Sequence, residues 1–294
     1  MEMRVLRYFL AVAREENITR AAEYLNITQP TLSRQLALLE EETGVTLFTR
    51  GSKRITLTDE GLLLRRRAQE IVALADKTME ELSSKDKNLS GTVTIGTGGL
   101  SANAKVLQAA ESFRKLHPDV RFSIFIGTAD SVQDRIDSGL ADFGILLEPV
   151  SVEKYGFIRL PQKERWAVIV HGSHRLATKD KICVEDLKDE LLVFPERLSV
   201  QSELHGWFSS HEDELKIAYS SNLSLIASEI VMCSDAVAFV IEGSLPYVDE
   251  TKIAIRPLYP PLESETVIAY KKRMPLTPVA SEFLQYLKCF LGME

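Results

Sequence analysis

The sequence predicts an α/β protein with a helical N-terminal part, one long connecting helix and a longer C-terminal part in which strands and helices alternate. Three observations predict this organisation. Residues 17–42 have the pattern of two short helices joined by a tight turn, residues 59–84 are helical in pattern without a proline, and short strands and helices alternate from Gly91 onward. At 294 residues, with 45% hydrophobic and 26% charged residues, the chain has material for about two domains.

The N-terminal part begins with a helix over residues 4–14, whose apolar side chains recur on one face. In the second helix Thr19 is placed to act as the N-cap, and Leu25 ends that helix. Asn26, Ile27 and Thr28 form the turn, and Thr28 is placed to cap the third helix. Pro30 falls in the first turn of the third helix, where a missing backbone N–H costs nothing.

The third helix has two faces. Leu32, Leu36 and Leu39 recur at intervals of four and three residues and should face inward. Short hydrogen-bonding side chains and one arginine occupy its outward, N-terminal part: Gln29, Thr31, Ser33, Arg34 and Gln35. Such side chains suit the donor and acceptor edges of a DNA major groove, so a helix-turn-helix is one interpretation. An ordinary helical hairpin with a solvated polar face is the other.

A basic turn follows the third helix. Gly44 marks the end of that helix, and two short apolar segments, 45–48 and 55–57, flank a turn with three cations: Arg50, Lys53 and Arg54. This pattern predicts a hairpin, or wing, whose cations could neutralise phosphates or enter a minor groove. The alternative is a solvated turn without a partner.

The long helix begins with a capping Thr58 and two acids. Apolar or small residues then recur at heptad spacing: Leu64, Ala68, Ile71, Ala75, Thr78 and Leu82. A helix of roughly 27 residues would be about 40 Å long, and an exposed seam of that length needs a partner. A second copy of the chain is the expected partner, and packing of the stripe on its own chain is the alternative. The polar segment Ser83–Ser90 reads as a hinge.

The C-terminal part begins with strands Thr92–Gly96, Val120–Ile126 and Ala141–Leu147, separated by helices at 104–116 and 131–138. This order predicts a parallel sheet. Further strands are expected at 166–170, 191–194, 216–219, 237–241, 253–257 and 266–271, and further helices at 200–209, 223–232 and 279–291.

Charge is distributed unevenly. Residues 1–67 carry eleven basic and nine acidic side chains, a net +2, and the remainder carries 24 against 33, a net −9, which together give −7. A mildly basic head on an acidic body permits nucleic-acid contact through one end only. No apolar run approaches the ~18–20 residues of a membrane span, and Leu6–Val12 makes a poor signal peptide. We therefore expect a cytoplasmic protein without a membrane partner.

The sequence offers few residue patterns typical of a catalytic, metal-binding or nucleotide-binding site. His171 and His174 resemble a metal pair only superficially and are more typical of a surface loop. Three scattered cysteines, Cys183, Cys233 and Cys289, have no zinc spacing, and Cys183 and Cys233 have no adjacent histidine to activate them. Gly96 and Gly98 lack the third glycine of a dinucleotide fingerprint and the lysine of a phosphate-binding loop. We expect no catalytic residue, no metal and no cofactor.

At this point the whole chain resembles the LysR-type transcriptional regulators. The resemblance rests on motifs in the same order along the chain: 8–13 (YFLAVA), 21–25 (AAEYL), 28–35 (TQPTLSRQ), 38–40 (LLE), 44–50 (GVTLFTR), 57–61 (LTDEG), 91–96 (GTVTIG) and 140–145 (LADFGI). The N-terminal cluster is dense and specific, and the match over the rest of the chain is looser.

The resemblance implies an α/β fold with an N-terminal winged helix-turn-helix and a long linker helix, followed by a two-subdomain part like the type-2 periplasmic binding proteins. The expected divisions are a DNA-binding domain (1–58), a linker and hinge (59–87), a first regulatory subdomain (91–161 with 266–294) and a second (162–265). Such regulators form homodimers or homotetramers and bind double-stranded promoter DNA as paired half-sites, and RNA polymerase is a further candidate partner. A two-fold dimer naturally reads an inverted repeat.

Site residues follow from the same resemblance. Those expected to bind DNA are Thr28, Gln29, Pro30, Thr31, Ser33 and Arg34 on the third helix and Arg50, Lys53 and Arg54 on the wing. A small-molecule effector, expected to be anionic, would lie between the subdomains. Hydroxyls and backbone N–H groups at a helix N-terminus could hold its charge. The residues expected to contact the effector are Thr97, Gly98, Gly99, Leu100, Ser101, Gly127, Thr128, Ser199, Val200 and Gln201.

Two points remain open in the sequence. The segment 233–235 (Cys-Ser-Asp) departs from the glycine-containing turn that the family often has there, and Asp235 could cap a turn or alter the ligand pocket. Trp166 and Trp207 read as packing residues, although either could line the cleft.

A solute-binding-protein-like sensor without a DNA role is the rival interpretation for residues 91–294, but it leaves the first 84 residues unexplained.

Overall fold

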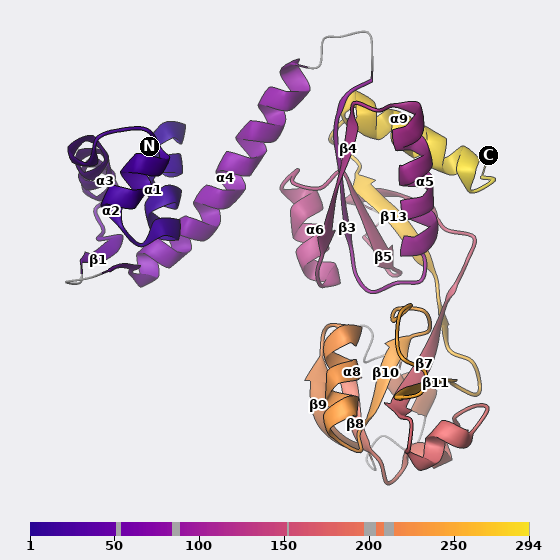
Figure 1. Ribbon diagram of the computed structural model, residues 1–294. Coiled ribbons are helices and arrows are strands. Elements are labelled where there is room, and N and C mark those ends of the chain that lie inside the picture. The colour runs from indigo at the N-terminus through magenta and orange to yellow at the C-terminus, as the bar shows by residue number, and fades with distance from the viewer. Residues whose placement is uncertain (51–53, 84–88, 152, 197–203, 209–214, 294) are drawn as a thin grey trace. The chain divides into compact units, whose positions relative to one another are not determined.

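The computed structural model describes residues 1–50, 54–83, 89–151, 153–196, 204–208 and 215–293 (Figure 1). The predicted site residues Lys53, Ser199, Val200 and Gln201 lie outside these ranges, as does most of the expected hinge. The chain divides into an N-terminal unit, residues 1–85, and a C-terminal unit, residues 86–294. Among the described residues no helix combines the length and the apolar character needed to cross a bilayer.

The N-terminal unit contains three helices, a two-stranded hairpin and the long helix. Their bounds are α1 Met3–Glu15, α2 Ile18–Tyr24, α3 Gln29–Thr43, β1 Phe48–Arg50, β2 Ile55–Leu57 and α4 Asp59–Ser83. The strands β1 and β2 pair antiparallel, which confirms the hairpin. Leu32, Leu36 and Leu39 are buried in a core shared with Phe9 of α1, which confirms that this stripe of α3 faces inward.

Local capping agrees with the sequence in most places. The Thr28 side chain accepts a hydrogen bond from the N–H of Thr31, and Gly44 ends α3 with a φ of 71°. The Thr58 hydroxyl accepts from the N–H of Gly61 at 3.0 Å. The predicted N-cap of α2 is wrong, because Asn17, two residues before Thr19, takes that role with its side-chain oxygen 3.0 Å from the N–H of Arg20.

The helix α4 packs on its own unit through part of the predicted seam. Ala68 is fully buried against the core of the unit, and Leu64 and Val72 pack beside it. The guanidinium of Arg7 on α1 pairs with Asp76 of α4, and this pair raises the pKa of Arg7. The alternative that the seam packs on its own chain therefore holds for its first two members, Leu64 and Ala68. Ile71, another member of the predicted seam, is exposed on α4, as are Leu63 and Leu74.

The C-terminal unit contains two sheets (Figure 1). The first has the strand order β4-β3-β5-β13-β6, and its strands are β3 Gly91–Thr97, β4 Val120–Ile126, β5 Phe143–Leu147, β6 Tyr155–Arg159 and β13 Thr266–Lys271. The strand β3 pairs parallel with both β4 and β5, which confirms the predicted parallel arrangement of these three strands, whereas β13 pairs antiparallel with β5. The strand β6 was not predicted. Its antiparallel pairing with β13 completes the sheet.

Helices cover both faces of the first sheet. They are α5 Asn103–Leu116, α6 Ala129–Asp137 and α9 Pro278–Phe290. Phe113 of α5 and Phe283 of α9 pack together with ring centroids 5.4 Å apart on one face. Val132 and Ile136 of α6 are buried on the other face, in a cluster with Val267 and Ala269 of β13.

The second sheet has the order β11-β7-β10-β8-β9, with β12 pairing to β7. Its elements are β7 Glu164–His171, β8 Leu191–Pro195, β9 Lys216–Ser221, α8 Ser224–Cys233, β10 Val237–Ile241, β11 Ile253–Pro257 and β12 Glu263–Ser264, with short helical turns η1 Arg175–Thr178 and η2 Val184–Leu187. Residues 204–208 are also helical, inside the predicted helix 200–209. The chain passes between the sheets twice, through residues 160–163 and through Glu265.

Candidate functional site

The N-terminal part of α3 presents a continuous polar surface. Thr28, Gln29, Pro30, Thr31 and Arg34 are exposed, and Ser33 is half-buried. The amide of Gln29 donates to the Ser33 hydroxyl at 2.9 Å, while the hydroxyls of Thr28 and Thr31 lie 2.8 Å apart. The buried leucines fix one side of the helix, so these donors and acceptors face solvent on the other side. Such a helix can present hydrogen-bonding groups to base edges in a major groove.

The hairpin of β1 and β2 also carries cations. Arg54 is exposed, and its guanidinium pairs with Glu16 at 3.4 Å. The N–H of Ile55 donates to the carbonyl of Glu16, so the end of α1 fixes the base of the hairpin. Arg50 is the last residue of β1, and only its backbone is described. Exposed ion pairs of this kind are weak, so Arg54 can exchange Glu16 for a phosphate at little cost.

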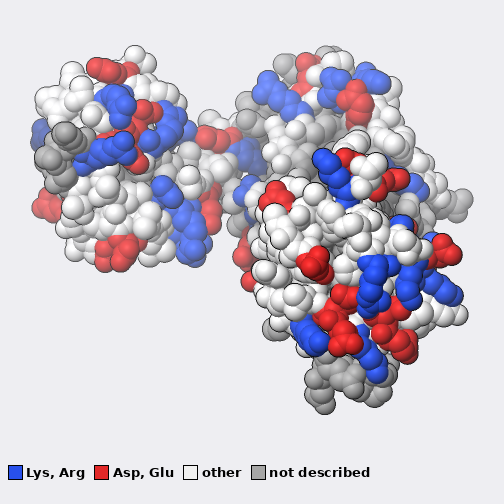
Figure 2. Space-filling view, turned by 60° about the horizontal axis from the view of Figure 1, so that its bottom comes forward, with Lys and Arg blue, Asp and Glu red and all other residues white. Residues whose placement is uncertain are grey.

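The surface charge is mixed on the face shown in Figure 2, where Lys and Arg alternate with Asp and Glu on both units. No single basic field covers that face. On this face, attachment to a polyanion would depend on individual cations, and its strength would fall with salt.

A cavity of about 690 Å³ opens between the two sheets of the C-terminal unit. Its walls are the ends of β3, β4 and β5 with their following loops on one side, and the ends of β8, β9 and β10 with the start of α8 on the other. Ligands of open α/β sheets bind at such carboxyl ends of strands. The lining residues are Gly98, Gly99, Leu100, Gly127, Thr128, Ala129, Asp130, Ile145, Leu146, Leu147, Trp166, Val193, Phe194, Pro195, Glu196, Ser221, Asn222, Leu223, Ser224, Ala227, Phe239, Val240 and Ile241.

The structure brings five of the expected effector residues to this cavity, namely Gly98, Gly99, Leu100, Gly127 and Thr128. Thr97 and Ser101 are not among the lining residues. The Thr97 side chain is buried, and its hydroxyl donates to the amide oxygen of Asn103 at 2.6 Å. Thr128 caps α6 by accepting from the N–H of Ser131.

The N-terminus of α5 is already occupied by a carboxylate of the chain. Glu164, at the start of β7, is buried, and its two oxygens accept from the N–H groups of Ser101 and Ala102 at 3.1 and 2.9 Å. We expected backbone N–H groups at this helix end to hold an anionic ligand. The Ser101 and Ala102 N–H groups do not serve that purpose, because an internal acid already satisfies them.

Most residues of the cavity wall formed by β8, β9, β10 and the start of α8 were not predicted from the sequence. Its residues share a position at or directly after the ends of β8, β9 and β10: Pro195 and Glu196, Ser221 to Ser224, and Ile241. Trp166 lines the cavity, whereas the indole of Trp207 donates to the carbonyl of Pro260 at 2.7 Å. Asp235 does not line the cavity, and the turn beside it is held by Ser234, whose hydroxyl accepts from the N–H of Ala236.

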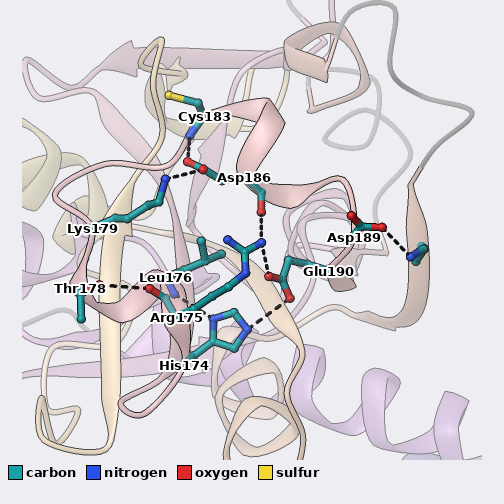
Figure 3. Close-up of polar contacts among 10 residues, drawn as sticks. His174, Arg175, Leu176, Thr178, Lys179, Cys183, Asp186, Asp189 and Glu190 are labelled. Carbon is teal, nitrogen blue, oxygen red and sulfur yellow. Dashed lines mark hydrogen bonds and ion pairs between the residues drawn. The ribbon is translucent and has the colours of Figure 1, made fainter.

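His174, in the loop after β7, is held by internal contacts (Figure 3). The Nδ1 of His174 accepts from the N–H of Leu176, and its Nε2 lies 3.2 Å from Glu190. The same carboxylate pairs with Arg175 at 2.6 Å. His171 Nδ1 lies 2.7 Å from the Ser173 hydroxyl. The described residues contain no cluster suited to a metal ion, and this group reads as a clamp between η1 and η2.

Family models match both units. Residues 3–62 match the model of bacterial regulatory helix-turn-helix proteins of the lysR family, and residues 86–291 match the LysR substrate binding domain. The HTH-type transcriptional regulator BenM of Acinetobacter baylyi is 34% identical over 72% of this chain and 70% of BenM. The uncharacterised HTH-type transcriptional regulator YybE of Bacillus subtilis is 27% identical over 98% of both chains.

Solved structures show a similar fold. Full-length CbnR in a crystal structure with its target DNA has a TM-score of 0.76, covering 99% of this chain and 100% of CbnR at 23% identity. A full-length BenM variant has a TM-score of 0.54, covering 100% of this chain and 98% of BenM at 27% identity.

Proposed function

This chain belongs to the LysR family of bacterial transcriptional regulators, and we propose that a small molecule bound in the cavity between its two sheets controls how it acts at promoter DNA. It is a DNA-binding regulator with an effector-binding domain, and not an enzyme. The observation that carries the DNA-binding part is the exposed polar N-terminus of α3, held on a buried leucine stripe. The rival interpretation, a solute sensor without a DNA role, does not account for this exposed polar surface of α3.

Residues divide by the kind of contact they would make. Gln29, Thr31, Ser33 and Arg34 would reach base edges, and Thr28 and Pro30 set the start of the helix. Arg54, with Arg50 and Lys53 of the same hairpin, would neutralise phosphates. Base contacts give sequence preference, whereas phosphate contacts give affinity for any duplex.

The exposed face of α4 would join two copies of the chain. Leu63, Ile71 and Leu74 are 55%, 39% and 38% exposed, and their spacing of eight and three residues places them on one side of a helix. Because the neighbouring stripe with Ala68 packs on α1, this second stripe is the surface left for a partner. A dimer joined here would carry two α3 helices, as an inverted repeat requires. A dimer of such dimers would be a tetramer.

The domain divisions fit this scheme: a DNA-binding domain over 1–58, a linker helix and hinge over 59–87, and two subdomains over 91–161 with 266–294 and over 162–265. Support comes from the two sheets, which draw their strands from these ranges. In the part of this unit that the structure describes, the chain crosses between the sheets at 160–163 and at Glu265. A ligand touching both walls could therefore shift their relative position and so change how a dimer presents its α3 helices. Action on the chromosome would place the protein in the cytoplasm, with RNA polymerase as a further candidate partner.

Retardation of a duplex carrying the region upstream of the gene tests the DNA-binding part. We expect the full chain to retard this fragment at low salt, with affinity falling steeply as salt rises. Replacing both Gln29 and Arg34 by alanine should remove the preference for this fragment over random duplex. Arg114→Ala, an exposed change on α5, serves as the matched control and should leave binding unchanged. Failure to bind any upstream fragment at low salt would refute the proposal.

A further inference from the structure

The exposed face of α4 carries charged side chains between its leucines. We propose that this face is self-complementary and selects a second copy of the same chain in the antiparallel direction, with Arg67 of each copy facing Glu70 of the other. The proposal rests on the proposed function, in which α4 joins two copies, and adds the orientation of that contact and the residues that give it specificity.

Four residues follow one side of α4 at intervals of four, three and four positions: Leu63, Arg67, Glu70 and Leu74. Because a helix turns once in about 3.6 residues, these intervals keep the side chains on one narrow stripe, as at the contact positions of paired helices. We call it the charged stripe. Its two leucines are exposed, and Arg67 and Glu70 leave 59% and 40% of their side-chain surface open to solvent. Ala68 marks a different side of α4, which packs in the core of the unit.

The charged stripe matches itself when it is turned end to end. Arg67 and Glu70 occupy its centre, and Leu63 and Leu74 lie four residues beyond them at either end. In a two-fold contact between antiparallel helices, residues at equal distances from the centre meet. Leucine would therefore meet leucine at both ends, and arginine would meet glutamate twice at the centre.

A parallel contact would bring like charges together. Each residue of a parallel two-fold pair meets its own copy, so arginine would face arginine and glutamate would face glutamate. Such like-charge contacts are destabilising. The next positions at the same spacing, Glu60 and Lys77, repeat the antiparallel match of opposite charges at equal distances from the centre. Lys77 has a further interaction within its own chain, and the proposal depends on the central pair alone.

Within one chain the two central charges already form a pair. The Arg67 guanidinium donates to the Glu70 carboxylate at 2.9 Å, three residues along the same helix. An exposed pair at this spacing is screened by water and is weak, so the arginine can exchange its own glutamate for that of a second copy. A helix with other charges at these two positions would leave charges unpaired between the leucines, and the contact would reject it.

Two single variants with reversed charge test the pairing, Arg67→Glu and Glu70→Arg. Each alone would place like charges at both central contacts, so we expect its self-association to be about tenfold weaker than that of the parent chain. An equimolar mixture of the two should associate about as tightly as the parent chain, because each central contact then joins opposite charges. Sedimentation velocity of the full chain over a dilution series measures these affinities.

The control is Lys252→Glu, which reverses one charge of an exposed pair at the same spacing in the C-terminal unit and should associate like the parent chain. Parent-like association of both single variants would overturn the proposal, and so would a mixture that associates as weakly as the single variants. A parent chain that stays monomeric would overturn the proposed dimer as well. None of these outcomes depends on the retardation of DNA.

Cysteine cross-linking tests the direction of the contact, in a chain with Cys183, Cys233 and Cys289 replaced by serine. The variants are Leu63→Cys and Leu74→Cys, whose positions lie eleven residues, or about 16 Å, apart along α4. In the antiparallel contact these positions meet across the two copies, so a bismaleimide shorter than this distance should join one variant to the other and neither variant to itself. Linking of each variant to itself, without linking between the two, indicates a parallel contact and overturns the proposal.

Discussion

The buried carboxylate of Glu164 accepts a hydrogen bond from the backbone N–H of Ala102 at 2.9 Å, across 62 residues of sequence. Glu164 begins β7 of the second sheet, and Ala102 immediately precedes α5, which covers the first sheet. A carboxylate at a helix N-terminus meets both unpaired N–H groups and the positive end of the helix dipole. The contact therefore fixes the loop of Gly98, Gly99 and Leu100 to the chain segment that crosses between the sheets.

Removing this carboxylate should destabilise the C-terminal unit. Glu164→Ala leaves two N–H groups near α5 without their acceptor, which costs about 1–3 kcal/mol of the free energy of unfolding. Both tryptophans, Trp166 and Trp207, lie in this unit, so their fluorescence during urea unfolding reports its stability. Glu263→Ala removes an exposed partner of Arg165 and should change stability by less than about 0.5 kcal/mol. Equal stability of the two variants would refute this role of Glu164.

Base-reading and phosphate-binding residues should be separable by substitution. Arg34→Ala should weaken binding to the upstream fragment by about 1–3 kcal/mol and bind random duplex nearly as well as the parent protein. Arg54→Ala should weaken both complexes by similar factors and make binding less dependent on salt, because one phosphate contact is lost. Fluorescence anisotropy at several salt concentrations measures both effects. Parallel losses on both duplexes for Arg34→Ala would remove it from the base-reading set.

The exposed stripe of α4 should control assembly. Ile71→Asp together with Leu74→Asp should convert the oligomer to smaller species in light scattering, because a buried contact would then hold unpaired charges. Gln69→Glu, at an exposed site on the other side of the helix, is the control and should not change the mass. Ala68→Asp, in contrast, should unfold the N-terminal unit, since Ala68 is fully buried. An unchanged oligomer in the double variant would mean that other surfaces join the chains.

The contacts of Asp186 in η2 predict a pH dependence of stability (Figure 3). Burial raises the pKa of Asp186, but hydrogen bonds from Lys179 and from the N–H of Cys183 outweigh it, so the pKa lies below the ordinary 3.8. A lowered carboxyl pKa means that the stabilisation is present above pH 3.8 and is lost as pH falls through the lower, folded-state value.

Asp186→Asn should therefore cost about 1 kcal/mol at neutral pH, and the difference from the parent protein should shrink below about pH 4. Asp189→Asn changes a neighbouring acid whose side chain is 90% exposed, and it should have little effect at either pH. Urea unfolding at the two pH values measures both variants. A cost for Asp186→Asn that does not change with pH would contradict the assigned role of its charge.

Much of the fold could be predicted because its causes are local. The spacing of Leu32, Leu36 and Leu39 determines which side of α3 is buried, and Thr28 and Gly44 set its ends by hydrogen bonds within a few residues. Alternating strands and helices likewise predict a parallel arrangement of β3, β4 and β5, since a crossover helix imposes that direction. The outward polar residues of α3 follow from the same spacing.

Tertiary structure alone decided the features that depend on residues far apart in the sequence. Heptad spacing places Ala68 and Ile71 in one seam, yet Ala68 is buried on α1 and Ile71 is exposed, because the position of α1 selects the covered face. The N-terminus of α5 looked open to an anion until the fold placed Glu164 against it. The sequence by itself determined the polar face of α3. The tertiary structure decided which groups are already paired, and therefore which remain for a ligand or a second chain.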